Sequence, residues 1–378
     1  MKFPIYLDYC STTPVDHKVV EEMNRYFTIE GIFGNPGASH YYGIQAKNEI
    51  KKAKDKIASI LKIRSEEIIF TSGATESNNL AIKGIVNSKK KFGNHILTSS
   101  IEHKSILESC NFLKQNGFLV TTINPNKKGI IAIQNIKNSI NEKTILISIM
   151  HVNNETGTIQ NIKKIGEICR KKNIIFHVDA AQSFGKVPIN LSKIPVDLLS
   201  LSGHKIYGPK GIGILFIRNK IKKKISSQIH GGNQQYGIRS GTLPVHLIIG
   251  MSKAMEISNN ILSKEKKRIS FLKLFFLKEI KKITRISING SVKDTIPNII
   301  NISFHKMNVE YLLSSVQELA ISQHSSCFSK NSSYVLQSMG VRKKLIDNSI
   351  RISFGKFTSK KDVVFLLKKI QTICNCIK

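Results

Sequence analysis

The sequence predicts an α/β fold, in which a large region of alternating strands and helices is followed by a smaller α+β region. Short runs of β-branched and apolar residues alternate with longer segments of helical periodicity. Several short runs are apolar almost throughout, such as 144–150, which is typical of strands covered by helices on both faces. After about residue 245 a long, Lys-rich amphipathic stretch replaces this alternation.

In the first region, apolar residues recur at helical spacing over 44–61, which predicts a helix. A strand is predicted over 67–71, and the turn Ser72-Gly73-Ala74-Thr75 leads from it into another helix. Further helices are predicted near 103–116 and 162–172. Further strands are predicted at 95–99, 118–123, 144–151, 174–179, 196–201 and 212–217.

In the second region, the amphipathic stretch over 251–283 predicts a long helix. Shorter strands are predicted at 298–304 and 349–354, and the end of the chain, 360–377, has the pattern of a helix. This region therefore reads as a second, smaller α+β unit.

The composition is that of a globular protein. The chain has 378 residues, 41% hydrophobic and 22% charged, which excludes a disordered chain, collagen and a small disulfide-stapled scaffold. No stretch approaches the ~18 consecutive apolar residues of a membrane span, and the start of the chain lacks the apolar core of a secretion signal. We therefore expect a soluble, cytoplasmic protein without a membrane partner.

The formal net charge of +33 would ordinarily suggest nucleic-acid binding. However, 49 of the 58 basic residues are Lys, whereas phosphate and base recognition favours the planar fork of Arg. The Lys residues are also spread along most of the chain. We expect solvated outer faces and no specific nucleic-acid partner.

The six Cys residues include no C-x-x-C pair and no Cys/His spacing typical of zinc. We therefore expect reduced thiols and neither a disulfide framework nor a structural metal site. Cys374 and Cys376, near the carboxyl end, are interpreted as free thiols on the last helix rather than a metal clip.

The loop Ser202-Gly-His-Lys-Ile-Tyr-Gly-Pro-Lys-Gly211 lies between two predicted strands. Its Gly and Pro residues favour fixed turns. Held in such a loop, Lys205 could form a Schiff base if its pKa is lowered. The alternative is that Lys205 is one more exposed lysine.

Asp179 and Gln182 follow the apolar run Ile174–Val178, at the carboxyl end of a predicted strand, where open α/β sheets bind ligands. A buried carboxylate requires a partner, and a protonated pyridine nitrogen would be one. The alternative is that Asp179 only caps the following helix.

Three further motifs follow predicted strands. Ser72–Thr75 could bind an anion through backbone N–H groups at a helix N-terminus, or could be a capping turn without a ligand. Glu102-His103 and His151-Val-Asn-Asn-Glu-Thr-Gly157 contain His and Asn residues that are, taken singly, more often structural than catalytic.

Taken together and in this order, the motifs closely resemble those of the cysteine desulfurases, a class V group of pyridoxal-phosphate enzymes. The resemblance looks closest to the housekeeping type of bacterial iron–sulfur cluster assembly and extends from Pro4 to Phe354. It rests on Thr71-Ser-Gly-Ala-Thr-Glu-Ser77, Glu102-His103-Lys104, His151-Val-Asn-Asn-Glu155, His177-Val-Asp-Ala-Ala-Gln-Ser183, Ser202-Gly-His-Lys205 and Arg239-Ser-Gly-Thr242.

The resemblance implies the type I fold of pyridoxal-phosphate transferases. Its large cofactor-binding domain, expected over 15–250, would contain a mainly parallel seven-stranded sheet covered by helices. The smaller α+β domain would comprise 1–14 and 251–378 and would carry the nucleophilic Cys loop.

The resemblance also implies residue roles. Lys205 would bind pyridoxal 5'-phosphate covalently, Asp179 would pair with the ring nitrogen, and His103 would stack on the ring as a catalytic residue. Gln182 and Asn154 would lie near the phenolic oxygen. The phosphate would be held by Ala74, Thr75, Ser202 and His204, and by Thr242 of the other subunit of a homodimer.

On the substrate side, Arg351 and Asn154 would bind the substrate, with Arg351 gripping its carboxylate in a bidentate contact. Cys327 would be the persulfide-forming nucleophile, active as its thiolate. Its persulfide would be a transient iron–sulfur ligand, and no other metal ligand is expected. The run Ser322-Gln-His-Ser-Ser-Cys327 lacks the family's small, Gly-containing residues, which predicts a stiffer or shorter loop.

The implied function is conversion of L-cysteine to L-alanine, with sulfur supplied to iron–sulfur cluster assembly and tRNA thiolation. The implied partners are an iron–sulfur scaffold protein and other sulfur acceptors. Two alternatives stay open: a selenocysteine lyase or other class V enzyme, which would need Lys205 but not Cys327, and a non-enzymatic basic binding protein.

Overall fold

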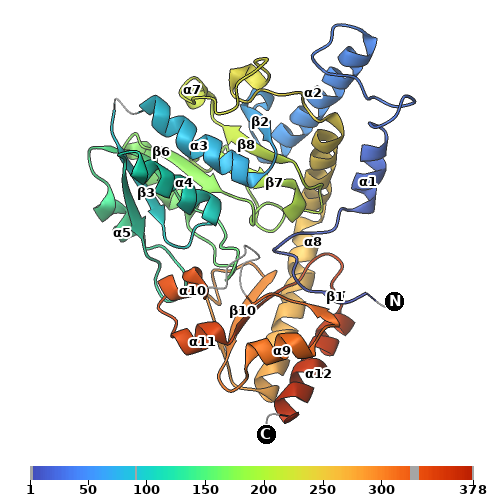
Figure 1. Cartoon of the computed structure of the whole chain (residues 1–378), viewed down its shortest axis with the longest axis vertical. Helices are drawn as coiled ribbons and strands as arrows, with labels where there is room; N and C mark the ends of the chain where they lie inside the picture. The colour runs from blue at the N-terminus through green and yellow to red at the C-terminus, as the bar shows by residue number, and fades with distance from the viewer. Residues whose placement is uncertain (1–2, 90–91, 324–331, 377–378) are drawn as a thin grey trace.

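A seven-stranded sheet forms the largest element of the computed structural model, which describes residues 3–89, 92–323 and 332–376 (Figure 1). The strand order is β2-β8-β7-β6-β5-β3-β4. Strand β8 is antiparallel to its neighbours β2 and β7, and the other four pairings are parallel. The expected mainly parallel, seven-stranded α/β fold is confirmed. The strands are β2 (Ile68–Thr71), β3 (His95–Ser99), β4 (Leu119–Ile123), β5 (Thr144–Ser148), β6 (Ile175–Asp179), β7 (Leu198–Ser202) and β8 (Gly213–Ile217).

Helices cover both faces of this sheet because the side chains of successive strand residues alternate between two cores. On one face, apolar side chains of α3 and α4 pack against residues such as Ile69 and Leu146. On the other face, α2, α6 and the start of α8 pack against residues such as Phe70 and Phe176. The helices of this part are α1 (His17–Asn24), α2 (Tyr41–Leu61), α3 (Ala74–Lys89), α4 (Lys104–Gln115), α5 (Ile133–Ser139), α6 (Ile162–Lys171) and α7 (Asn219–Lys222).

A separate three-stranded antiparallel sheet, in the order β12-β10-β9, lies below the main sheet in Figure 1. Its own core contains Phe276, Ile302 and Phe354. The elements of this part are α8 (Val245–Ile283), β9 (Ile286–Ile288), β10 (Ile299–Phe304), α9 (Val309–Ser315), α10 (Tyr334–Ser338), α11 (Lys343–Asp347), β12 (Ser349–Ser353) and α12 (Lys360–Cys376).

Helix α8 connects the two parts. It starts directly after Pro244, earlier than the predicted residue 251, and continues without interruption to Ile283. Pro is well placed at such a start because it cannot donate a backbone hydrogen bond. The proposed domain boundary at residues 250 and 251 therefore falls inside a continuous helix, and the division itself stays a prediction.

The N-terminal segment joins the second part rather than the main sheet. Strand β1 (Ile5–Tyr6) pairs in parallel with β11 (Leu319–Ala320). Just after it, the Ser353 backbone N–H donates to the carbonyl of Leu7 at 2.7 Å. The loop that follows β1 therefore starts beside β12 before it crosses to the main sheet.

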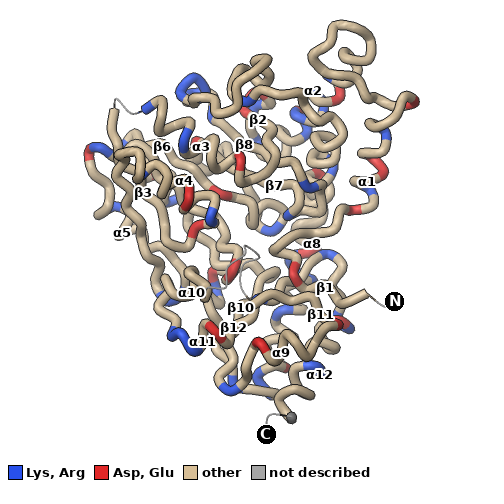
Figure 2. Tube along the Cα trace, viewed as in Figure 1, with Lys and Arg blue, Asp and Glu red and all other residues tan. Residues whose placement is uncertain are grey.

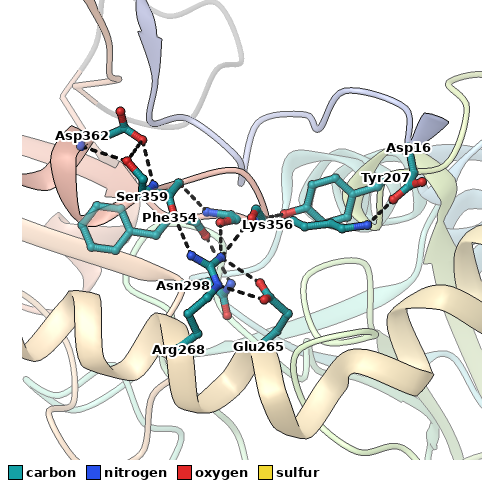
Figure 3. A network of polar contacts seen from close by, with 11 residues as sticks. Asp16, Tyr207, Glu265, Arg268, Asn298, Phe354, Lys356, Ser359 and Asp362 are labelled. Atoms are coloured by element: carbon teal, nitrogen blue, oxygen red, sulfur yellow. Dashed lines mark hydrogen bonds and ion pairs between the residues drawn. The ribbon is translucent and has the colours of Figure 1, made fainter. Parts of the chain in front are cut away.

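A polar network holds the end of β12 against α8 and against the loop after β7 (Figure 3). The Arg268 guanidinium on α8 donates to the carbonyls of Gly355 and Thr358 and pairs with Glu265. The Lys356 backbone N–H donates to the Tyr207 hydroxyl at 2.6 Å, and the Lys356 amine pairs with Asp16. These contacts couple the two parts of the molecule close to Lys205.

Lys and Arg residues are distributed over both parts of the molecule rather than gathered on one element (Figure 2). Within the described ranges, no helix combines the length and the apolar character that crossing a membrane requires.

Replacement of Tyr207 by Phe should destabilise the protein. The substitution removes the hydroxyl that accepts a hydrogen bond from the Lys356 backbone N–H. An N–H group left without an acceptor lowers the free energy of unfolding by about 1–3 kcal/mol. Urea unfolding should reveal the loss, and Tyr311→Phe, at a half-exposed tyrosine, should unfold like the unmodified protein. Equal stability of the two variants would contradict the role of this contact.

Candidate active site

A cavity of about 520 Å³ opens at the carboxyl ends of the main-sheet strands and reaches across to β12. Strands β2, β6 and β7 all end at this cavity, as expected for a ligand site in an open α/β sheet. It brings together most of the residues that the sequence singled out: Ala74, Thr75, His103, Asn154, Asp179, Gln182, Ser202, His204, Lys205 and Arg351.

Among the described sequence candidates, only Thr242 does not line the cavity. Thr242 is exposed, just before the start of α8. Cys327 lies outside the described residues, so its predicted role is untested by this geometry. Glu102, which precedes His103 in its motif, is fully buried, and its Oε1 accepts hydrogen bonds from the Ser99 hydroxyl and from the Met150 backbone N–H.

Lys205 ends the short turn Gly203–Lys205 that follows β7. Its Nζ donates to the backbone carbonyls of Cys10, at 2.7 Å, and Ser11. Burial is the main reason that the pKa of this amine falls to about 8. A larger fraction of the amine is therefore neutral near pH 7 than for an ordinary lysine, which is what a nucleophilic amine requires.

Asp179 is the last residue of β6 and is nearly buried. One carboxylate oxygen accepts from the Ala181 backbone N–H at 2.9 Å, and the other accepts from Asn78 Nδ2 at 2.9 Å. Residues 181–186 form turns, so Asp179 caps a turn and not a helix. The two hydrogen bonds fix the orientation of the carboxylate at the cavity.

His103 caps the N-terminus of α4, and its Nδ1 accepts from the Ser105 backbone N–H at 3.2 Å. Burial lowers the pKa of this imidazole, so the neutral ring is favoured. With Nδ1 as the acceptor, we assign the ring proton to Nε2. Asn78 Nδ2 also donates to Ser105 Oγ at 2.9 Å, which links the supports of His103 and Asp179.

The start of α3 provides the anion-binding part of the cavity. Ser72, Gly73, Ala74 and Thr75 line it at the helix N-terminus, where backbone N–H groups and the helix dipole favour a negative charge. Opposite them, His204 Nδ1 contacts Thr12 Oγ1 at 3.1 Å, and burial lowers the pKa of its imidazole to about 4. This imidazole is therefore neutral at pH 7 and can donate a hydrogen bond without adding charge.

Arg351 on β12 is almost fully buried. Its Nη2 donates to Asp8 Oδ1 at 2.9 Å and to Ser11 Oγ at 2.6 Å, and its Nη1 donates to the Asn154 carbonyl at 3.1 Å. Both Nη2 hydrogens are therefore engaged. A bidentate grip on a carboxylate through Nη1 and Nη2 requires Asp8 or Ser11 to give way.

Sequence reasoning missed the residues that support this site. Cys10, Ser11 and Thr12 line the cavity, and Asn78 holds Asp179. A usable signal existed in the run Cys10-Ser-Thr-Thr-Pro14, which is rich in hydroxyl groups and directly follows an apolar segment. No sequence signal marked Asn78, because a polar residue within a helix is usually exposed.

Comparisons with known proteins agree on one family. Residues 5–366 match the aminotransferase class V family. The chain is 48% identical over 381 residues to the cysteine desulfurase IscS of Buchnera aphidicola (subspecies Baizongia pistaciae), covering 100% of this chain and 94% of that protein. It is 46% identical to the cysteine desulfurase IscS of Escherichia coli K12, covering 98% and 93% of the two chains.

Two solved structures are similar along nearly the whole chain. A NifS-like protein superposes with a TM-score of 0.93 at 35% identity, covering 99% of this chain and 100% of that chain. A structure described as SspA in complex with cysteine superposes with a TM-score of 0.83 at 38% identity, covering 94% and 99%.

The lowered pKa of Lys205 predicts unusual reactivity of its amine. In protein without bound cofactor, acetylation of Lys205 by acetic anhydride should reach its half-maximal rate near pH 8, about two units below an ordinary lysine. Peptide mass spectrometry over a pH series measures this, with the peptides of surface lysines as internal references. A midpoint near pH 10 for Lys205 would show that burial does not tune this amine.

Proposed function

The chain belongs to the aminotransferase class V family and, within it, to the cysteine desulfurases, and from this premise we propose that it converts L-cysteine to L-alanine and passes the sulfur to Cys327 as a persulfide. The observation that carries the proposal is the convergence of Lys205, Asp179 and Arg351 on one cavity. These residues come from β6, from the turn after β7 and from β12, and each supplies a different chemical group.

The residues of the cavity fit pyridoxal phosphate, the cofactor of this family. The cavity offers an amine of lowered pKa, a carboxylate fixed by two donors, and a helix N-terminus. In addition, the buried Oδ1 of Asn154, which lines it, has no hydrogen-bond partner among the described residues. An amine, a ring-nitrogen partner and an anion site are the three groups that this cofactor requires.

When bound, the cofactor supplies a sink for the electron pair released at the substrate Cα. Lys205 would hold it covalently, and its amine would be freed to move the Cα proton. Asp179, whose carboxylate is oriented by two hydrogen-bond donors, would pair with the ring nitrogen and keep it protonated. The neutral His103 ring would stack on the cofactor, and Gln182 and Asn154 would lie near its phenolic oxygen.

The phosphate would be held by Ala74 and Thr75 at the start of α3, and by Ser202 and His204 on the loop after β7. Both groups line the cavity. Glu76, also in the first turn of α3, is paired with Arg239 at 2.9 Å, so its negative charge is balanced. That ion pair also links the anion site to the segment that leads to Thr242.

Cysteine would enter with its carboxylate toward Arg351 and Asn154. The Asn154 carbonyl already accepts from the Arg351 guanidinium, so the two residues would bind the substrate as a unit. The Ser11 hydroxyl is the partner that gives way at lower cost, because removing Asp8 would leave a buried guanidinium without its counter-charge.

Two anchored ends support the role of Cys327 as the sulfur acceptor. On the N-terminal side, Ser322 exchanges backbone hydrogen bonds with Arg351. On the C-terminal side, Ser333 Oγ donates to the carboxylate of Glu155, next to Asn154. Ser322 and Ser333, on either side of Cys327 in the sequence, thus lie beside residues proposed to bind substrate.

Sulfur from Cys327 would supply iron–sulfur cluster assembly and tRNA thiolation, through an iron–sulfur scaffold protein and other acceptors. The cluster-assembly role is supported by the name IscS of the similar bacterial enzymes. The persulfide on Cys327 would then act as the transient iron–sulfur ligand.

The function is tested by Cys327→Ser. The unmodified protein should release alanine and, with a reductant, sulfide from L-cysteine. Cys327→Ser should still bind the cofactor and cysteine, which need Lys205 and Arg351, yet form less than about one hundredth of the sulfide, because a hydroxyl is a far weaker nucleophile than a thiolate. Cys110→Ser, at a buried cysteine of α4, is the matched control and should stay active.

Full activity of Cys327→Ser would sink the persulfide proposal. With selenocysteine as substrate, equal turnover by both proteins would favour the selenocysteine lyase alternative, which does not need Cys327.

We further propose a homodimer in which Thr242 contributes to the partner's phosphate site. Six exposed apolar residues lie on the loop after α1 and the start of α2, and the Tyr42 ring contacts the rings of Phe33 and Tyr41. We call this set the apolar patch: Phe27, Ile29, Phe33, Tyr41, Tyr42 and Ile44. The Phe27 ring packs on His246 at a centroid distance of 4.6 Å, so the patch adjoins the start of α8 and Thr242. A large exposed apolar patch marks a protein–protein contact, so we infer that this one is buried against a second copy of the chain. Thr242, which does not line the cavity of its own subunit, would then contribute to the cavity of the partner.

Tyr41→Asp should weaken this dimer. Tyr41 is 69% exposed, so the change leaves the folded chain intact but places a charge in the apolar interface. Sedimentation velocity over a dilution series should give a dissociation constant at least about tenfold higher. Leu274→Asp, at an equally exposed leucine on α8, is the control. A monomeric unmodified protein with full activity would contradict the shared site.

A further inference from the structure

Lys186 is a charged residue beside the cavity that the proposed chemistry leaves without a role. It lies four residues after Gln182, in the turns that follow β6. Its Nζ donates to Gln182 Oε1 at 3.0 Å. It also borders a small cavity behind the main one, together with Cys10, Lys205 and Tyr207.

Gln182 makes a second hydrogen bond at its other end. Its Nε2 donates to the Cys10 carbonyl at 2.7 Å, and Lys205 Nζ donates to the same carbonyl at 2.7 Å. The buried Gln182 amide is therefore connected to the Lys205 amine through one shared acceptor.

These partners determine which way the Gln182 amide points. An ammonium group has donors only, so Lys186 requires an oxygen opposite it. A backbone carbonyl has acceptors only, so Cys10 requires the amide nitrogen. With one Nε2 hydrogen bonded to Cys10, the second Nε2 hydrogen is left for the cavity that Gln182 lines.

We propose that Lys186 is a positioning residue that fixes the Gln182 amide so that it presents an N–H, and not its carbonyl oxygen, to the phenolic oxygen of bound pyridoxal phosphate. This inference rests on the proposed function, because it concerns the cofactor of that reaction. A fixed donor favours the anionic form of the phenolic oxygen, and a flipped amide would place two acceptor oxygens together.

The electrostatic surroundings agree with this role. Burial lowers the pKa of the Lys186 amine to about 8, so it is mainly charged at pH 7 and donates only. Cys10 and Lys205 act on its charge, and its charge in turn lowers the pKa of His204. Tyr9 and Tyr207 are the other titratable groups that line the same small cavity. Asp8, Asp179 and Arg351 act on Lys205 but are not contacts of Lys186.

The test uses the purified holoenzyme and the visible absorbance of its bound pyridoxal phosphate as a function of pH. In Lys186→Met, which keeps the length of the side chain but not its donors, the midpoint of the absorbance change should rise by about one pH unit, because the anionic oxygen loses its fixed donor. Cofactor affinity, titrated on protein from which the cofactor has been removed, should fall about tenfold. Lys193→Met is the control, because it removes the same charge at an exposed lysine. It should change neither the midpoint nor the cofactor affinity.

A double-mutant cycle separates orientation from charge. Gln182→Ala should raise the midpoint, and adding Lys186→Met to it should produce no further shift if Lys186 acts through the amide. A full additional shift in the double variant would overturn the proposal, since it would mean that the charge of Lys186 acts directly.

The proposal would also be overturned if Lys186→Met had a lower thermal stability but an unchanged midpoint of the absorbance change. If Lys186→Met does not fold, Lys186→Gln retains a donor and serves instead, and its midpoint should lie between those of the unmodified protein and Gln182→Ala. If the proposed function itself is wrong, the unmodified protein will show no cofactor absorbance. That result is different from an unchanged midpoint in Lys186→Met, so the two failures can be distinguished.

Discussion

The cavity depends on the loop that follows β1, whose backbone carbonyls are the acceptors for the Lys205 amine. The Cys10 carbonyl receives hydrogen bonds from both Lys205 and Gln182, and Ser11 contacts both Lys205 and Arg351. The loop also bonds to the turn that carries Lys205, because the Thr13 backbone N–H donates to the His204 carbonyl at 2.9 Å. This short loop thus fixes the positions of Arg351, Lys205 and Gln182 relative to one another.

Charge is the second constraint on this site. Lys186, Lys205 and Arg351 bring positive charge to a partly enclosed space, while His103 and His204 are kept neutral by burial. Asp8 and Asp179 supply the compensating carboxylates. The surplus of cations suits a ligand that carries a phosphate and a substrate that carries a carboxylate, and burial strengthens both attractions relative to water.

The sequence predicted the main sheet well because its strands are apolar on both faces. Six of the seven predicted runs contain an observed strand in full, and the seventh, 196–201, stops one residue before the end of β7 at Ser202. The short strands β1, β9 and β11 were not predicted, because two or three residues carry no recognisable period.

Among the site residues, the predicted ones carry distinctive side chains in distinctive motifs. Cys10 and Ser11 were missed because they act on Lys205 through backbone carbonyls, which every residue type possesses. Asp8, the ion-pair partner of Arg351, was missed for a related reason: it lies far from Arg351 in sequence, and only tertiary structure brings the two together.

The pairing of β1 with β11 also has a consequence for biosynthesis. The Cys10 backbone N–H donates to Ser353 Oγ, a contact that spans 343 positions of the chain. During translation the N-terminal loop is made long before its partners on β11 and β12, and the strands of the main sheet are made between them. The main sheet can therefore form while these partners are still missing, whereas the cavity, which Arg351 of β12 lines, is complete only once β12 has been made.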